Sequence, residues 1–294
     1  MIVGDLIVDE TWYVDANKLS PEAPVPVAYL TSSEPHRSPG GAALAASYAH
    51  KDKKSSAFLT ATNTDNEEWL ADKGIEIYSL KSVKNVVKTR YVDVNSNYHL
   101  LRIDNDDVVD FPAITSDILS ESLQSLFKQN ISSIVILDYR KGIFNDKDTC
   151  QYMINEALKK NIPTYVDTRC DITKFRGCTY LKLNKKEYDA ACAAQSINCP
   201  YSLCRELNIA NLIVTEGKEG AKLFSLATET MEQYKPDLTK YNGTPDVTGC
   251  GDVFDINFCY YCFQEDLFSP TEALRFSVDR ATEYAYTSIG DRLC

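Results

Sequence analysis

The chain contains an apolar, β-branched run at Ser133-Ile134-Val135-Ile136-Leu137, and a second run of this kind follows at Thr164-Tyr165-Val166-Asp167. Short runs of this composition are typical of buried strands. The segment between them, Lys147–Lys160, has a helical pattern of apolar residues. A strand, a helix and a second strand in this order predict two parallel strands, with the helix packed on one face of their sheet.

The same alternation continues toward both ends of the chain. Further strands are predicted at Ile2–Gly4, Ala57–Thr60, Ile75–Leu80, Tyr180–Leu183 and Leu212–Thr215. Further helices are predicted at Gly41–His50, Asn66–Lys73, Asp117–Gln129, Lys186–Ala194 and Ser202–Leu207, with one more after Asp252 and a last one capped by Ser269 and Glu272. The expected fold is α/β, with a mostly parallel sheet covered by helices on both faces.

Two stretches, Tyr13–Leu30 and Val86–Ile103, read instead as β-structure with little helix. The second has a polar tip at Asn95-Ser96-Asn97, which is typical of a turn between two strands. The two stretches are therefore expected to form a small sheet that stands off the main one. No internal repeat and no Gly/Ser-rich linker interrupts the chain, which predicts one domain over residues 1–294.

Composition limits the classes of partner. The chain has 31 Lys and Arg against 42 Asp and Glu, a net charge of −11, which disfavours nucleic acid and anionic membranes. No apolar run approaches the ~20 residues that span a bilayer. The ten cysteines are sparse and no signal peptide is visible, so a reduced, cytoplasmic protein is expected. The pair Cys259 and Cys262 lies in an apolar stretch and is read as core packing rather than as a zinc or redox site.

The loop Asp246-Val247-Thr248-Gly249-Cys250-Gly251-Asp252 precedes a predicted helix. Its two glycines let backbone N–H groups converge on an anion, and the helix N-terminus adds positive potential. Asp252 would lie in the first turn, where its carboxylate could accept a proton from an attacking hydroxyl. A plain helix start after a glycine turn has the same spacing, so both interpretations stay open on these residues alone.

Three other motifs have a structural and a functional interpretation. Gly40-Gly41-Ala42-Ala43 allows close approach of a ligand, or close helix packing. Asn184-Lys185-Lys186-Glu187 follows a strand and could orient phosphate, water and Mg²⁺, or simply begin a solvated helix. Thr215-Glu216-Gly217 is either an ordinary turn after a strand or part of a hairpin beside a nucleotide.

Taken in order, these motifs resemble the ribokinase-like (PfkB) carbohydrate kinases, and within them the D-glycero-β-D-manno-heptose 7-phosphate kinases. Gly4-Asp5-Leu6-Ile7-Val8-Asp9 looks like the opening Gly-Asp-x-x-x-Asp of the family, and Leu19–Val27 is nearly identical to a stretch of the heptose kinases. Further similar segments follow in family order at Pro39–Ala43, Lys88–Arg90, Leu100–Asp104, Asp138–Gly142, Asn184–Glu187 and Asp246–Asp252.

The resemblance implies a ribokinase-like three-layer sandwich with a β-lid at about residues 11–30 and 86–103. It implies an ATP-dependent kinase that phosphorylates a hydroxyl of a sugar phosphate, most simply the anomeric hydroxyl of a heptose 7-phosphate. A homodimer formed through the lid is a further expectation, because an exposed sheet edge favours pairing.

The resemblance also assigns residues. Asp252 would be the catalytic base and Gly249, Cys250 and Gly251 the anion hole. The ATP·Mg²⁺ phosphates would meet Asn184, Lys185, Lys186 and Glu187, with Glu187 nearest the metal, and the nucleotide would meet Thr215 and Gly217. Sugar hydroxyls would meet Asp9, Gly40 and Gly41. Lys88, Arg90 and Arg102 are expected at the substrate's own phosphate, because an acidic protein needs local cations there.

Some residues depart from the family pattern. Leu44 replaces an Asn that hydrogen-bonds the sugar, and Asn257 stands where a small residue is usual. Asp255 lies one turn after Asp252, where it would raise the pKa of the base or help to hold a metal. Cys250 is tolerable because an anion hole uses backbone N–H groups. These departures keep two alternatives open: a sugar- or nucleotide-binding protein with impaired catalysis, and a kinase for a nucleoside or an unphosphorylated sugar.

Overall fold

The computed structural model describes residues 1–81, 85–106, 116–169, 171–263 and 268–287. Its main sheet is nine-stranded, in the order β14-β13-β12-β11-β10-β9-β1-β5-β6. The strands are β1 (Ile2–Gly4), β5 (Ala57–Thr62), β6 (Glu76–Lys81), β9 (Ile134–Asp138), β10 (Thr164–Thr168), β11 (Tyr180–Asn184), β12 (Asn211–Thr215), β13 (Ala221–Ser225) and β14 (Thr230–Tyr234). All pair in parallel except β13 and β14, which form an antiparallel hairpin at one edge.

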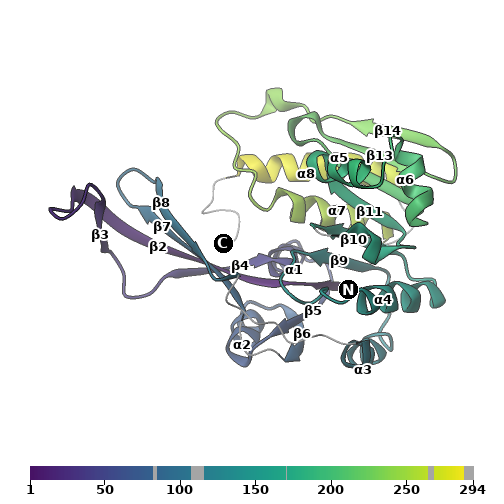
Figure 1. Ribbon diagram of the computed structural model, residues 1–294, viewed down its shortest axis with the longest axis horizontal. Helices are drawn as coiled ribbons and strands as arrows, with labels where there is room; N and C mark the ends of the chain where they lie inside the picture. Colours follow the sequence, from purple (N-terminus) through teal and green to yellow (C-terminus); the bar gives the residue numbers. More distant parts are fainter. Residues whose placement is uncertain (82–84, 107–115, 170, 264–267, 288–294) are drawn as a thin grey trace.

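Helices cover both faces of this sheet (Figure 1). They are α1 (Ala42–Lys51), α2 (Thr64–Asp72), α3 (Ser116–Leu126), α4 (Lys147–Lys159), α5 (Lys185–Ala194), α6 (Pro200–Leu207), α7 (Cys250–Phe263) and α8 (Pro270–Tyr286). Alternate strand residues serve two separate cores: Ile134 and Ile136 pack with α3, α4 and α6, whereas Val135 and Leu137 pack with α1, α7 and α8. The α/β prediction with helices on both faces is confirmed.

A second sheet stands off the main one (Figure 1). Its strands are β2 (Leu6–Leu19), β3 (Pro26–Leu30), β4 (His36–Gly41), β7 (Val86–Asp93) and β8 (His99–Asp104), in the order β3-β2-β7-β8 with β4 beside β2. Both stretches that were predicted as β-structure lie in it. The sheet extends further than predicted, because β2 begins directly after β1 and β4 leads into α1.

Cys259 belongs to the core on one face of the main sheet, and Cys262 is partly buried against that core. Cys259 is buried, and burial raises the pKa of its thiol well above the ordinary value. Among the described residues, no helix combines the length and apolar composition needed to cross a bilayer.

Candidate active site

The glycine loop leads directly into α7. Gly249 has φ +80°, a left-handed conformation that favours glycine, and a Cβ there would lie 2.8 Å from Leu44 Cδ2. Leu44 therefore packs directly against the loop. Cys250 begins α7 directly after the loop, and its N–H donates to the Val247 carbonyl at 3.2 Å.

Asp252 lies in that first turn and is 7% exposed. Its Oδ1 accepts a hydrogen bond from the hydroxyl of Tyr139, which follows β9. Burial raises the pKa of Asp252 to about 6; the hydrogen bond from Tyr139 opposes this rise, Asp167 adds to it, and Lys182 and Arg169 oppose it. A carboxylate with a pKa near neutrality is suited to general base catalysis.

Asp5 holds the loop that carries Tyr139. Its carboxylate accepts hydrogen bonds from the backbone N–H groups of Tyr139 (2.9 Å), Lys141 (3.1 Å) and Ile143 (3.1 Å). Burial, with a contribution from Asp138, raises the pKa of Asp5 to about 7. Sequence reasoning gave Asp5 no role, although it stands in the opening Gly-Asp pair of the motif.

A cavity of about 230 Å³ joins the glycine loop to the edge of the main sheet. Thr215 and Gly217 line it from the end of β12, Cys250 and Gly251 from α7, and Ala281 among others from α8. The structure thus brings the predicted nucleotide residues next to the predicted anion hole.

Asn184 and Glu187 form a capping box at the start of α5. The Asn184 side chain accepts from the Glu187 N–H (3.0 Å), and the Glu187 carboxylate accepts from the Asn184 N–H (2.7 Å). Lys185 pairs with Asp189 on the same helix, and Lys186 is exposed. The carboxylate of Glu187 and the amide oxygen of Asn184 lie at the carboxyl end of β11. The cavity just described is not lined by any of the four residues Asn184, Lys185, Lys186 and Glu187.

The residues predicted for the sugar lie where the second sheet joins the main one. Asp9 on β2 pairs with Arg90 on β7 at 2.6 Å, between Oδ1 and Nη1. A Cβ at Gly40 would overlap Asp9 Oδ2, and Gly41 has φ +57°. Glycine at position 40 therefore leaves room for the Asp9 carboxylate.

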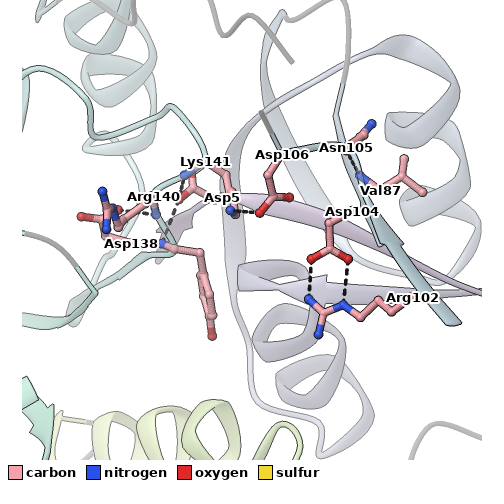
Figure 2. Close-up of polar contacts among 10 residues, drawn as sticks. Asp5, Val87, Arg102, Asp104, Asn105, Asp106, Asp138, Arg140 and Lys141 are labelled. Atoms are coloured by element: carbon pink, nitrogen blue, oxygen red, sulfur yellow. Dashed lines mark hydrogen bonds and ion pairs between the residues drawn. The ribbon is translucent and has the colours of Figure 1, made fainter. Parts of the chain in front are cut away.

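Of the three predicted lid cations, Arg90 and Arg102 each pair with an acid. Lys88 and Arg90 are two residues apart on β7, and Arg102 on β8 lies opposite Arg90, so the three share one face. Arg102 makes a bidentate pair with Asp104, at 2.7 and 2.6 Å (Figure 2). Lys141, from the loop after β9, pairs with Asp106 (Figure 2).

A second, polar cavity of about 470 Å³ was not predicted. It is lined by the cations Arg140, Arg169 and Lys174, by Asp138 and Asp171, and by Phe144 and Asn145. Arg140 has φ +62°, an unusual conformation for a residue with a side chain. The Arg169 guanidinium lies 4.6 Å from the ring centre of Tyr139, whose hydroxyl contacts Asp252. Arg140 lies in the segment Asp138–Gly142, which resembles the family, but the resemblance assigns no role to Arg140.

The two polar departures on α7 are both buried. Asp255 accepts a hydrogen bond from the Tyr165 hydroxyl (2.7 Å) and lies 3.5 Å from Lys182 Nζ. Asp167 on β10 is the acid that most raises the pKa of Asp252, so the repulsion that was expected from Asp255 on α7 comes from a strand instead. Asn257 donates to Tyr48 Oη (3.2 Å) and to the Val253 carbonyl (2.7 Å). No group of three metal-ligating acidic, cysteine or histidine side chains occurs among the residues that the structure describes.

No protein-family model matches the sequence. The bifunctional protein HldE of Pasteurella multocida (strain Pm70) is 31% identical over 271 residues, which cover 86% of this chain and 53% of the relative. HldE of Histophilus somni (strain 129Pt) is 30% identical over 273 residues, with the same coverage. The chain thus spans about half the length of the curated relatives it matches.

Solved structures share the fold at low identity. Phosphofructokinase-2 from Escherichia coli in complex with potassium has a TM-score of 0.75 and 17% identity, covering 100% of this chain and 94% of that one. Ribokinase from Thermotoga maritima has a TM-score of 0.67 and 17% identity, covering 97% and 92%. The chain therefore has the fold of these two kinases, and over 86% of its length it is similar in sequence to about half of HldE.

Proposed function

We propose that this protein transfers the γ-phosphoryl group of MgATP to a hydroxyl of a sugar phosphate, with the anomeric hydroxyl of a heptose 7-phosphate as the simplest acceptor. The observation that carries the proposal is Asp252, a buried carboxylate with a pKa of about 6 at the start of α7. It would take the proton of the attacking hydroxyl. The N–H groups around Gly249 and Gly251 would stabilise the charge on the transferred group.

The cavity beside the loop supports a nucleotide. Its lining from α8 is largely apolar, with Val278, Ala281 and Ala285, as a purine base requires, and the cavity reaches Cys250 and Gly251, where the phosphates would lie. Mg²⁺ neutralises charge on the phosphates of a bound nucleotide. Glu187, with Asn184 beside it, would hold the ion through one carboxylate, the phosphates and water, which suits Mg²⁺ because it keeps several waters in protein sites.

The acceptor would lie between Asp9, Gly40 and Gly41 on one side and Asp252 on the other. For its own phosphate we favour the polar cavity at Arg140, Arg169 and Lys174 over the lid cations. The cavity has the volume for a phosphate, and Arg169 lies against the tyrosine that contacts the base. On the lid, Arg90 and Arg102 already pair with Asp9 and Asp104.

We also propose that the protein forms a homodimer through the lid sheet. Apolar side chains on β3 and β8 are exposed, among them Leu30 (57%), Leu101 (53%) and Ile103 (50%). An exposed apolar sheet of this kind favours pairing with a second copy. The E. coli phosphofructokinase-2 fold relative has a tetrameric inhibited form.

The test of the function is ADP release from MgATP with heptose, hexose and pentose phosphates and with their unphosphorylated counterparts. We expect turnover with a sugar phosphate, and ³¹P NMR of the product then locates the new phosphate. Binding of a sugar phosphate without ADP formation would favour the binding-protein alternative. Turnover confined to a nucleoside or an unphosphorylated sugar would contradict the proposed substrate class.

Two variants test the phosphate subsite in the same assay. Arg169→Met is expected to raise KM for the sugar phosphate by at least tenfold, because a charge-assisted contact to phosphate is lost. Arg102→Met is the matched lid variant and is expected to change KM little. The opposite ranking would assign the substrate phosphate to the lid.

A further inference from the structure

A buried ion cluster lies behind the glycine loop. Lys182 on β11 is 5% exposed, and its Nζ lies 2.7 Å from Asp167 Oδ2 on β10 and 3.5 Å from Asp255 Oδ1 on α7. Asp167 is 8% exposed and Asp255 is fully buried. Asp255 Oδ2 has no hydrogen-bond partner among the described residues. Such clusters usually contribute less stability than well-packed apolar side chains, so stability alone does not account for it.

The position of the ammonium is specific. A Cβ on Gly251 would lie 3.4 Å from Lys182 Nζ, so the charge sits against the backbone of the residue directly before Asp252. Asp167 and Asp255 hold it there from two sides. Burial alone would lower the pKa of Lys182, but the two carboxylates raise it above its ordinary value, so the side chain stays charged. Burial also raises the pKa of Asp255 well above its ordinary value, and Lys182 opposes that rise.

We propose that Lys182 is a positioning residue for phosphoryl transfer, because its clamped ammonium supplies a fixed positive charge behind the Gly249–Gly251 amides and favours the ionised form of Asp252. The inference rests on the proposed function of this site. It gives Asp255 a role as well: the carboxylate is the second arm of the clamp, on the same helix as the base and one turn beyond it.

Because charges of both signs face Asp252, we expect two variants to shift its pKa in opposite directions. They are Tyr139 from the loop after β9, Asp167 and Arg169 from β10 and the residue after it, and Lys182 from β11. Loss of the ammonium in Lys182→Met should raise the pKa of Asp252 by about one unit, and loss of the carboxylate in Asp167→Asn should lower it. The double variant loses both charges, and its Asp252 should titrate near the wild-type value. Lys182→Arg should keep the wild-type value.

The experiment follows Asp252 directly, by ¹³C NMR of the aspartate carboxyl groups against pH without ATP, with Asp252→Asn to assign the resonance. In parallel, kcat and KM are measured against pH. Lys182→Met is expected to move the acidic limb of kcat to higher pH and to lower kcat by about tenfold, with little change in KM for ATP. Direct loss of an anion-hole donor would cost more, about 10²–10³-fold.

Lys182→Met and the double variant separate charge from folding. Both lack the Lys182 amine and they differ only in the Asp167 charge, so the same titration of Asp252 in each would show that the buried charges do not act on Asp252, and that result would overturn the inference. An unchanged titration in Lys182→Met would overturn it too. If the variants shift the pKa of Asp252 as expected but the wild-type protein phosphorylates no sugar, the effect of Lys182 on Asp252 stands. The proposed function is contradicted instead.

Discussion

Asp252 carries a free-energy cost in the folded protein, because its carboxylate is buried and Asp167 lies nearby. The hydrogen bond from Tyr139 and the charges of Lys182 and Arg169 reduce that cost without removing it. The same environment gives the carboxylate the affinity for a proton that a general base needs at neutral pH. Function and stability are therefore opposed at this residue.

Asp252→Asn tests this opposition. Turnover should fall by at least about 10²-fold, since the base is lost. The pKa of Asp252 is about 6 in the folded protein against 3.8 ordinarily. Wild-type stability therefore falls as the pH rises from about 4 to 6, and the loss is complete above pH 6. The variant should be more stable than wild type by about 2–3 kcal/mol at pH 8 and equal to it near pH 4. Urea unfolding at both pH values measures this, and a difference independent of pH would contradict it.

At the scale of elements, the pairing of β4 with β2 forms the side of the site that is proposed to bind the sugar. Gly40 pairs with Ile7, and this register brings it under the Asp9 carboxylate. Gly40→Ala would force that carboxylate aside and disturb its pair with Arg90. We expect KM for the sugar to rise by about tenfold to a hundredfold, with KM for ATP unchanged. Glu232→Ala is the control, because this side chain is exposed on the edge strand β14; equal KM values in both variants would contradict the assignment of Asp9.

Elements with a strong local signal could be predicted, and those formed by distant pairing could not. The runs at β9 and β10 are apolar and β-branched, and the capping box of α8 is present, with Ser269 Oγ accepting from the Glu272 N–H at 3.2 Å. The segment His36–Gly41 has little strand propensity. It becomes β4 because β2 offers it an antiparallel partner.

The site divides in the same way. Asp252 and its glycine loop form one contiguous motif, so they could be found in the sequence. Lys182 and Asp255 are far apart in the chain and meet only because β11 packs under α7. The polar cavity joins Arg140, from the loop after β9, to Arg169 and Lys174, from the connection between β10 and β11, and no motif in the sequence marks Arg140 as a neighbour of the other two.

At the scale of the molecule, the net charge of −11 and the proposed binding of two phosphorylated ligands are compatible because the cations are local. Arg140, Arg169 and Lys182 lie at or behind the carboxyl edge of the main sheet, where α7 also begins. Long-range repulsion of polyanions and short-range attraction of a phosphate can therefore coexist, since salt screens distant charges over about 10 Å.

The lid sheet has an outer strand, β8, that is exposed to solvent. Every residue of β8 is exposed, and Leu101 and Ile103 point to the same face because they are two positions apart. We expect a homodimer, with twice the 33.0 kDa of one chain, in size-exclusion chromatography with light scattering. Leu101→Glu combined with Ile103→Glu should give a monomer, because two charges would be buried in the interface. Leu158→Glu, on the exposed side of α4, should leave the dimer intact. A wild-type monomer across the micromolar range would contradict the dimer, and a dimer that survives the double substitution would place the contact elsewhere than on β8.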